Sequence, residues 1–413
     1  MRRTHSLLIL LFTACGVANA QVVPAATGIV RAGKNLQYAA RYDETAVFSS
    51  DQTNWQTATT SGSLNYMNTN ERHPFTAQYT GGYTWTLTGP DYQSGQFHQL
   101  FLTQGLNWRK WKFLAGDDAS YLPQAPTTGF SGIPGIGEPI GVSPINPVTG
   151  QTILTLNTHA VENNGTVDLE YNPRIQTAIS FGGSSGLLRY PNGDGLDTND
   201  ESGTATLVQS LDGRNALSAN YAYSNFSYPG YNVSFATNTG LFGYQRKWTR
   251  NLATNLAAGP MYISSSVTSV VPNSLSVGAS ASATYLLRFT SAGASFTRGT
   301  NGGGGYLFGS VVDIATGNFT KQFGLNLTIG LTGGYERTDA FSTFTSTNGA
   351  FGGAQGTYQL TQNLIIFANY TGIEQSIQQS LATPLPTNVL NEMMHTIGFG
   401  IGFSPRQAHP RQQ

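Results

Sequence analysis

The histidines and carboxylates of this chain are spaced in ways that give little support to catalysis. No histidine stands close in sequence to both a nucleophile and an orienting acid, although a triad can also be assembled from distant residues. The histidines beyond the amino-terminal segment are His73, His98, His159, His395 and His409. The adjacent carboxylates Asp117 and Asp118 would face opposite ways on a strand, which disfavours a catalytic dyad. We therefore expect no enzyme activity and no cofactor.

One acidic run, between residues 192 and 201, has the residue types that bind a divalent metal ion. Carboxylates at Asp194, Asp197 and Asp200 could supply oxygen ligands to calcium. Their spacing does not match an EF-hand loop, so we predict no metal site and keep these three residues as weak candidates. Lys and Arg number 21 against 21 Asp and Glu, which gives no sign of a nucleic-acid partner.

The dominant pattern of the sequence is an alternation of apolar residues with small or polar ones. From Phe75 to Leu87, aromatic and aliphatic residues alternate with hydroxyl, amide and glycine residues, and similar runs cover 217–223 and 323–331. The last run places Ile397, Phe399, Ile401 and Phe403 on one face of a strand and threonine or glycine on the other. A period of two with these residue types predicts strands that have lipid on one side and a polar lumen on the other.

The amino terminus resembles an export signal. Arg2 and Arg3 precede the apolar run Leu7–Phe12, and Ala18 and Ala20 follow it in a small-x-small pattern, so we predict a signal peptide over residues 1–20. A second reading has Cys15 as a lipidated cysteine, but the cleavage pattern fits better. With cleavage after Ala20, the mature chain has no cysteine and no disulfide.

Composition limits how such a chain can cross a membrane. Charged residues make up only 10% of the chain, Gly numbers 49, and the mean hydropathy of −0.20 is not high. Beyond Gln21 no stretch of about 20 apolar residues occurs, so a spanning helix is excluded. The other structure that can cross lipid is a closed barrel, in which the backbone groups of each strand form hydrogen bonds with the neighbouring strands.

Short and long connections alternate between the runs, which sets the number of strands. Seven tight turns and eight longer links predict 16 strands of an all-β, antiparallel up-and-down barrel. A further pair, Leu36–Phe48 and 61–67 joined by 49–60, raises the count to 18. Arg41, Asp43 and Glu44 weaken the first of these strands, so both counts stay open, and we favour 18.

These features together resemble the porin-type outer-membrane β-barrels. The resemblance covers most of residues 36–404 and implies a bacterial outer-membrane location, with residues 21–35 and 405–413 in the periplasm. It also implies that the last strand, with Ile397, Phe399, Ile401 and Phe403, is the signal read by the barrel-assembly machinery. Residues 404–413 continue past Phe403, where many family members stop. Self-association into a homo-oligomer is not decided by the sequence, although Asp117 hints at a protein-facing patch.

Strand number points to the function. Barrels of 16 to 18 strands leave an aqueous channel, so we expect passive diffusion of small hydrophilic solutes. Inward glycines at 324, 330, 398, 400 and 402 either widen the lumen or allow close packing. The alternative is a barrel closed by its own loop that acts as a surface binding or scaffold protein.

The longest link, residues 123–165, decides between these two functions. It is nearly uncharged and carries Phe130 and several isoleucines, so we expect it to fold into the lumen as a constriction, with Glu138 as its charge. An exposed cap on the outer face is the other possibility.

Basic residues gather at the tight turns. If they point inward, they make the periplasmic mouth positive and favour anions, whereas charges solvated at turns would have no such effect. The candidates are Arg109, Arg174, Arg214, Arg246, Arg288 and Lys321.

Overall fold

The computed structural model describes residues 36–49, 54–68, 70–89, 94–124, 158–193, 195–303, 307–341, 346–378 and 393–403. These residues form eighteen strands in a single sheet. The strands are β1 (Leu36–Ser49), β2 (Trp55–Asn68), β3 (Phe75–Thr88), β4 (Gly95–Asn107), β5 (Trp111–Gln124), β6 (Thr158–Arg174), β7 (Thr177–Arg189), β8 (Thr198–Ser210), β9 (Asn215–Tyr228), β10 (Val233–Lys247), β11 (Leu252–Ser265), β12 (Ser274–Leu286), β13 (Thr290–Asn301), β14 (Ser310–Phe323), β15 (Leu327–Ala340), β16 (Ser346–Gln359), β17 (Leu364–Gln378) and β18 (Met393–Phe403). The described residues contain no helix with the length and apolarity of a membrane span.

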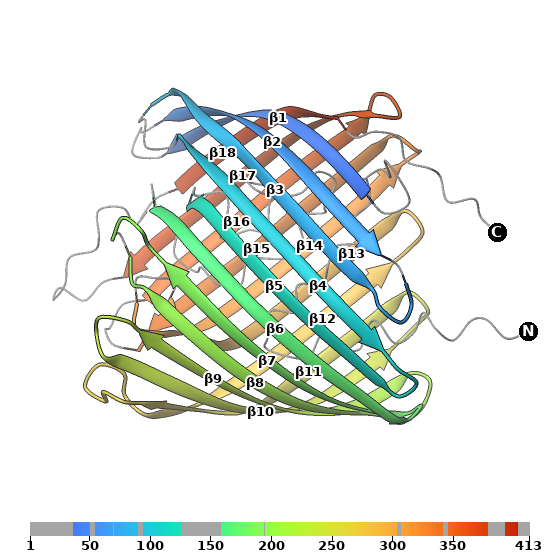
Figure 1. Cartoon of the computed structure of the whole chain (residues 1–413), viewed down its shortest axis with the longest axis vertical. Helices are drawn as coiled ribbons and strands as arrows, with labels where there is room; N and C mark the ends of the chain where they lie inside the picture. Colours follow the sequence, from blue (N-terminus) through green and yellow to red (C-terminus); the bar gives the residue numbers. More distant parts are fainter. Residues whose placement is uncertain are drawn as a thin grey trace, which may run out of the picture.

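The sheet closes on itself because β1 pairs antiparallel with both β2 and β18. Phe403 lies opposite Ala40 on one side of the seam, and Tyr66 lies opposite Leu36 on the other. Each remaining strand pairs with its neighbours in the sequence, and the strands run obliquely around the barrel (Figure 1). The all-β, antiparallel barrel is therefore confirmed, and the strand count is 18.

The two ends of the barrel differ in their connections. Short turns such as 175–176 and 287–289 join strands at one end, which we call the turn end. Leu36 of β1 and Phe403 of β18 lie at this end. The other end, which we call the loop end, carries the longer connections, including 125–157 and 379–392, most of which lie outside the described residues.

The outer face carries two bands of aromatic side chains, as transmembrane barrels do. One band lies near the turn end and includes Tyr38, Tyr66, Trp111, Tyr285, Phe323 and Tyr358, all exposed. The second lies nearer the loop end and includes Tyr83, Trp85, Tyr223, Tyr262 and Tyr335. Exposed leucines such as Leu64, Leu256 and Leu331 lie between the bands. Ile397, Phe399, Ile401 and Phe403 of β18 belong to this face, as the alternation predicts.

Two of the predicted boundaries are wrong. The run 323–331 is not one strand, because Phe323 ends β14, a turn occupies 324–326, and β15 begins at Leu327. Gly324 adopts a φ of 62° in this turn, a left-handed conformation that glycine tolerates, so it does not face the lumen from a strand. The link 123–165 is also shorter than expected, since β5 continues to Gln124 and β6 begins at Thr158. Its central part, 125–157, lies outside the described residues.

Candidate functional site on the inner wall

The inner face of the barrel is lined by hydroxyl side chains along several strands. In β3 the residues that alternate with the exposed aromatic ones are Thr76, Gln78, Thr80, Thr84 and Thr86. Hydroxyl pairs bridge neighbouring strands: Thr59 and Thr84 are 3.1 Å apart, Ser184 and Ser202 2.7 Å, and Ser295 and Thr316 2.6 Å. An inner surface of this kind can hold water and hydrogen-bond polar solutes.

Three carboxylates from distant parts of the sequence gather on one region of this wall. Asp118 of β5 and Asp200 of β8 lie on one line across four strands. Between them, Asn164 of β6 lies opposite Asp118, and Gly186 of β7 lies opposite both Asn164 and Asp200. A side chain at Gly186 would collide with the Asp200 carboxylate, so this carboxylate lies over the glycine. Glu162 occupies the next inward position of β6, close enough to Asp118 and Asp200 to interact electrostatically with both.

Two further carboxyl groups lie on the inner face. Asp168 of β6 lies over Gly182, where an added Cβ would be 2.7 Å from the Asp168 Oδ1. Glu336 of β15 is buried and accepts a hydrogen bond of 3.2 Å from the Thr338 hydroxyl. We call Asp118, Glu162, Asp168, Asp200 and Glu336 the acidic wall.

Two basic side chains of the inner face are paired with other carboxylates. Arg41 pairs with Asp43 at 2.8 Å, and Lys112 pairs with Glu170 at 2.9 Å. Arg41 also stacks on the ring of Phe367, 4.1 Å from its centre. Because these two pairs are neutral overall, they do not offset the carboxylates of the acidic wall.

The predicted basic residues do not all line the lumen. Arg246 lies over the exposed ring of Trp248 at 4.1 Å, and Lys321 lies over the exposed ring of Phe323 at 4.8 Å. Both belong to the outer face, so the prediction of an inward, positive mouth is wrong for these two. The other four, Arg109, Arg174, Arg214 and Arg288, are exposed at the turn end, and their influence on anions stays a prediction. The constriction candidates Phe130 and Glu138 lie outside the described residues.

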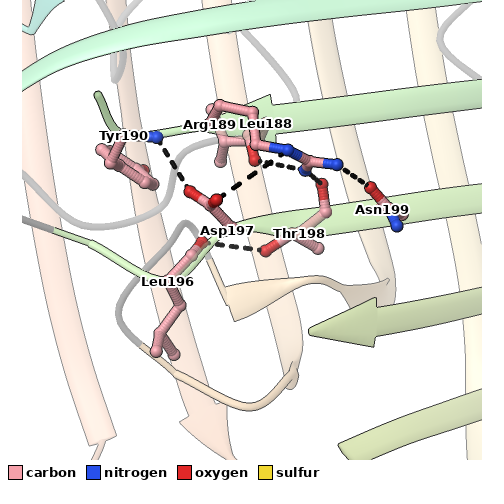
Figure 2. A network of polar contacts seen from close by, with 7 residues as sticks. All are labelled: Leu188, Arg189, Tyr190, Leu196, Asp197, Thr198 and Asn199. Atoms are coloured by element: carbon pink, nitrogen blue, oxygen red, sulfur yellow. Dashed lines mark hydrogen bonds and ion pairs between the residues drawn. The ribbon is translucent and has the colours of Figure 1, made fainter. Parts of the chain in front are cut away.

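Of the three weak metal candidates, the structure describes Asp197 and Asp200, and these two have different surroundings. Asp197 accepts a hydrogen bond of 3.0 Å from the backbone N–H of Tyr190 and lies 3.8 Å from Arg189 Nε (Figure 2). Arg189 also donates to the backbone oxygens of Leu188 and Thr198 and to the Asn199 side chain. Asp197 therefore serves to fold the connection between β7 and β8, whereas Asp200 belongs to the acidic wall. Asp194 lies outside the described residues, and the described chain holds no group of three metal-ligating side chains.

The pair Asp117 and Asp118 splits between the two faces, as the alternation predicts. Asp117 points outward and accepts a hydrogen bond of 3.1 Å from the Asn163 amide, which is also on the outer face. The register of β5 with β4 and with β6 is continuous through Gly116, so no bulge interrupts the alternation there. A subunit contact at Asp117 stays a prediction.

Histidines lie on the outer face beside tyrosines. The hydroxyl of Tyr79 is 2.7 Å from His98 Nδ1, and that of Tyr370 is 2.8 Å from His395 Nδ1. His159 stacks on Tyr121 with ring centres 5.7 Å apart. These contacts place the three rings among the aromatic side chains of the outer face rather than beside the carboxylates of the lumen.

The loop end holds a buried apolar cluster that the sequence did not indicate. Its members are Tyr228, Val233, Phe235, Ile263 and Val271, which we call the inner cluster. Phe308 before β14, Val311 of β14 and Phe341 after β15 pack against it. In the sequence these residues belong to separate strands and loops, so only their three-dimensional contacts reveal the cluster.

Comparison with known proteins gives remote likenesses in structure alone. No protein-family model matches the chain, and no curated protein matches it. Among solved structures, Pseudomonas aeruginosa OccK2 (OpdF) is 10% identical with a TM-score of 0.48, over 92% of this chain and all of that one. Pseudomonas aeruginosa OccK5 (OpdH) is 11% identical with a TM-score of 0.46, over 91% and 99%. Acinetobacter baumannii OccAB4 is 7% identical with a TM-score of 0.45, over 90% and 98%. Likenesses this remote leave the function to be argued from the chain's own residues.

Proposed function

We propose that this protein is a porin-like channel for the passive diffusion of small hydrophilic solutes. The observation that carries the proposal is a closed barrel of 18 strands with exposed aromatic and aliphatic side chains outside and hydroxyl and carboxylate side chains inside. Barrels of about this strand number enclose an aqueous channel, whereas small barrels are filled by their own side chains. A polar inner surface has a physical use only where water reaches it.

The acidic wall supports a preference for cations over anions. An inward carboxylate attracts a cation and repels an anion, and a row of carboxylates on the lumen wall favours the passage of cations. This proposal opposes the anion preference that inward basic residues at the turn end would give. Neutral solutes would be limited by size alone.

The runner-up function is a plugged barrel that binds partners at its surface. Two apolar clusters inside the loop half favour it: the inner cluster, and a second group formed by Val47, Trp55, Phe351, Ile373 and Met394. Buried apolar side chains there reduce the space through which a solute can pass.

The outer face supports a location in the bacterial outer membrane, reached by export through the signal peptide. Its two aromatic bands match the two interfaces of a lipid bilayer, so we propose outer-membrane lipid as the partner of this face. The barrel-assembly machinery is proposed to read β18, whose outward residues are Ile397, Phe399, Ile401 and Phe403.

Liposome swelling tests the proposed function. Protein folded into liposomes should let neutral sugars enter, with rates that fall as the sugar grows, because a water-filled lumen sieves by size. Liposomes with the same amount of heat-unfolded protein are the control. A folded protein that admits no monosaccharide would favour the plugged barrel instead.

A further inference from the structure

The wall of the barrel is split at the loop end between β12 and β13. The pairing of these strands runs from Leu286 opposite Ser291 to Ala279 opposite Arg298 and goes no further. Both strands continue beyond this point, β12 through residues 274–278 and β13 through 299–301. β12 stays paired with β11 there, and β13 stays paired with β14 as far as Asn301 opposite Ser310. The strand ends have therefore separated along one line.

The separated end of β13 reaches the inner face of strands that are not its neighbours. The Thr300 hydroxyl donates a hydrogen bond of 3.3 Å to the Thr237 hydroxyl of β10. The Tyr228 hydroxyl at the end of β9 donates one of 3.1 Å to the backbone oxygen of Gly302. Thr237 and Tyr228 are buried, at 3% and 2% exposure. The end of β13 thus crosses over β11 and β12 instead of standing beside β12.

Apolar contacts hold the same segment against the inner cluster. Phe308 meets Tyr228 edge-on with ring centres 5.1 Å apart, and Phe341 meets Phe235 at 5.2 Å. Phe341 is linked to this hairpin because its backbone N–H donates to the Gly309 oxygen at 3.2 Å. Gly309 has a φ of 81°, and a side chain there would collide with the Phe235 ring. Only glycine therefore permits this close approach.

The direction of the side chains shows which face of the hairpin is turned inward. Thr300 lies opposite Val311. By the two-residue period of a strand, both belong to the same face of the hairpin as Phe296, which is exposed on the outer face. Yet Thr300 bonds to the inner face of β10, and Val311 packs against the inner cluster. The outer face of this hairpin therefore rests on the inner face of β9, β10 and β11, which requires the hairpin to fold into the mouth.

We propose that this hairpin, residues 299–303 and 307–312, is a gate of the channel, and that the conformation described here is its closed state. The inference rests on the proposed channel function. In the open state β13 pairs again with β12, with Gly299 opposite Gly278 and Thr300 opposite Val277, and the hairpin leaves the mouth. Closing buries apolar side chains, whereas opening restores backbone pairing to residues 274–278. The segment thus has two alternative packings, one stabilised by buried apolar side chains and the other by backbone hydrogen bonds, and such a segment can act as a two-state switch.

Two disulfides that share one cysteine test the gate. In a Cys15→Ser background, T237C/T300C ties the hairpin to β10 and locks it closed, whereas V277C/T300C ties it to β12 and locks it open. In the open state Val277 and Thr300 would be directly opposed on paired strands, a distance that a disulfide spans. In the closed state the Thr237 and Thr300 hydroxyls are 3.3 Å apart. The single variant T300C is the control for the substitution itself.

We expect oxidised T237C/T300C to show at least tenfold fewer openings in a planar bilayer than the same protein after reduction. Oxidised V277C/T300C should show at least tenfold more, and T300C alone should not respond to reductant. Equal currents before and after reduction, with both cross-links confirmed by gel mobility, would overturn the gate and leave the channel intact. If no variant conducts in either redox state, the channel function itself fails.

Discussion

Replacing Gly400 with leucine should prevent the barrel from closing properly. Gly400 lies on the inner face of β18, opposite Asp43 on one side and Phe367 on the other. A side chain there would collide with the Phe367 ring and come 2.5 Å from the backbone oxygen of Tyr42. The Phe367 ring cannot simply turn away, since Arg41 is stacked on it. Overpacking of this kind costs about 1–3 kcal/mol, and here it falls on the seam that joins the first and last strands.

The measurement is the mobility of unheated protein in SDS gels, together with the urea midpoint of unfolding. We expect G400L to lose most of the compact, fast-migrating form, or to unfold at a clearly lower urea concentration. G330L is the matched control, because Gly330 also faces inward and a Cβ there meets nothing closer than the Thr320 hydroxyl at 3.9 Å. Equal behaviour of the two variants would show that the seam is not crowded as described.

Neutralising the acidic wall should remove the preference for cations. The triple variant D118N/E162Q/D200N keeps the shape of the side chains and replaces three carboxyl groups of the inner face with uncharged amides. A unit charge about 4 Å from an ion is worth roughly 1 kcal/mol even in water, or about a fivefold change in local ion concentration. We therefore expect the permeability ratio of potassium to chloride to fall by about fivefold or more.

The reversal potential in a potassium chloride gradient measures this ratio. E201Q is the matched control, because Glu201 follows Asp200 on β8 but lies on the exposed outer face, opposite Ser185 and Asn225. Its replacement should leave the reversal potential unchanged. A wild-type protein that prefers chloride would contradict the role of the acidic wall and would favour the exposed arginines at the turn end.

The strands could be predicted from the sequence because lipid and lumen impose opposite demands on alternate residues. The weakest prediction was β1, where Arg41, Asp43 and Glu44 argued against a strand. Arg41 and Asp43 both face inward and neutralise each other, while Glu44 accepts a hydrogen bond of 2.7 Å from the Tyr42 hydroxyl on the outer face. A charge that has a partner does not exclude a strand, and the partner becomes visible only once the register is known.

The run 323–331 shows a different limit of the same pattern. The turn at 324–326 separates β14 from β15 without interrupting the alternation of apolar residues, so periodicity alone cannot locate it. The left-handed φ of Gly324 is what marks the turn, and a glycine in the sequence signals that conformation only weakly.

The candidate site was harder to predict because it depends on contacts between distant strands. Asp118, Glu162 and Asp200 are far apart in sequence and meet only through the register of β5 to β8. In the sequence Asp200 stands out only as part of an acidic run, but its neighbour Asp197 pairs with Arg189 and Glu201 lies on the outer face. The inward fold of the hairpin after β13 has no local signal either, apart from the glycines near its tip, which also suit an ordinary loop.

Single-channel recording of the refolded protein in a planar bilayer tests the central claim most directly. A channel predicts discrete, stable current steps in potassium chloride and a reversal potential on the cation side when a salt gradient is applied. If neither the wild-type protein nor oxidised V277C/T300C gives steps while both are correctly folded by gel mobility, the channel function is contradicted, and the plugged barrel becomes the better account.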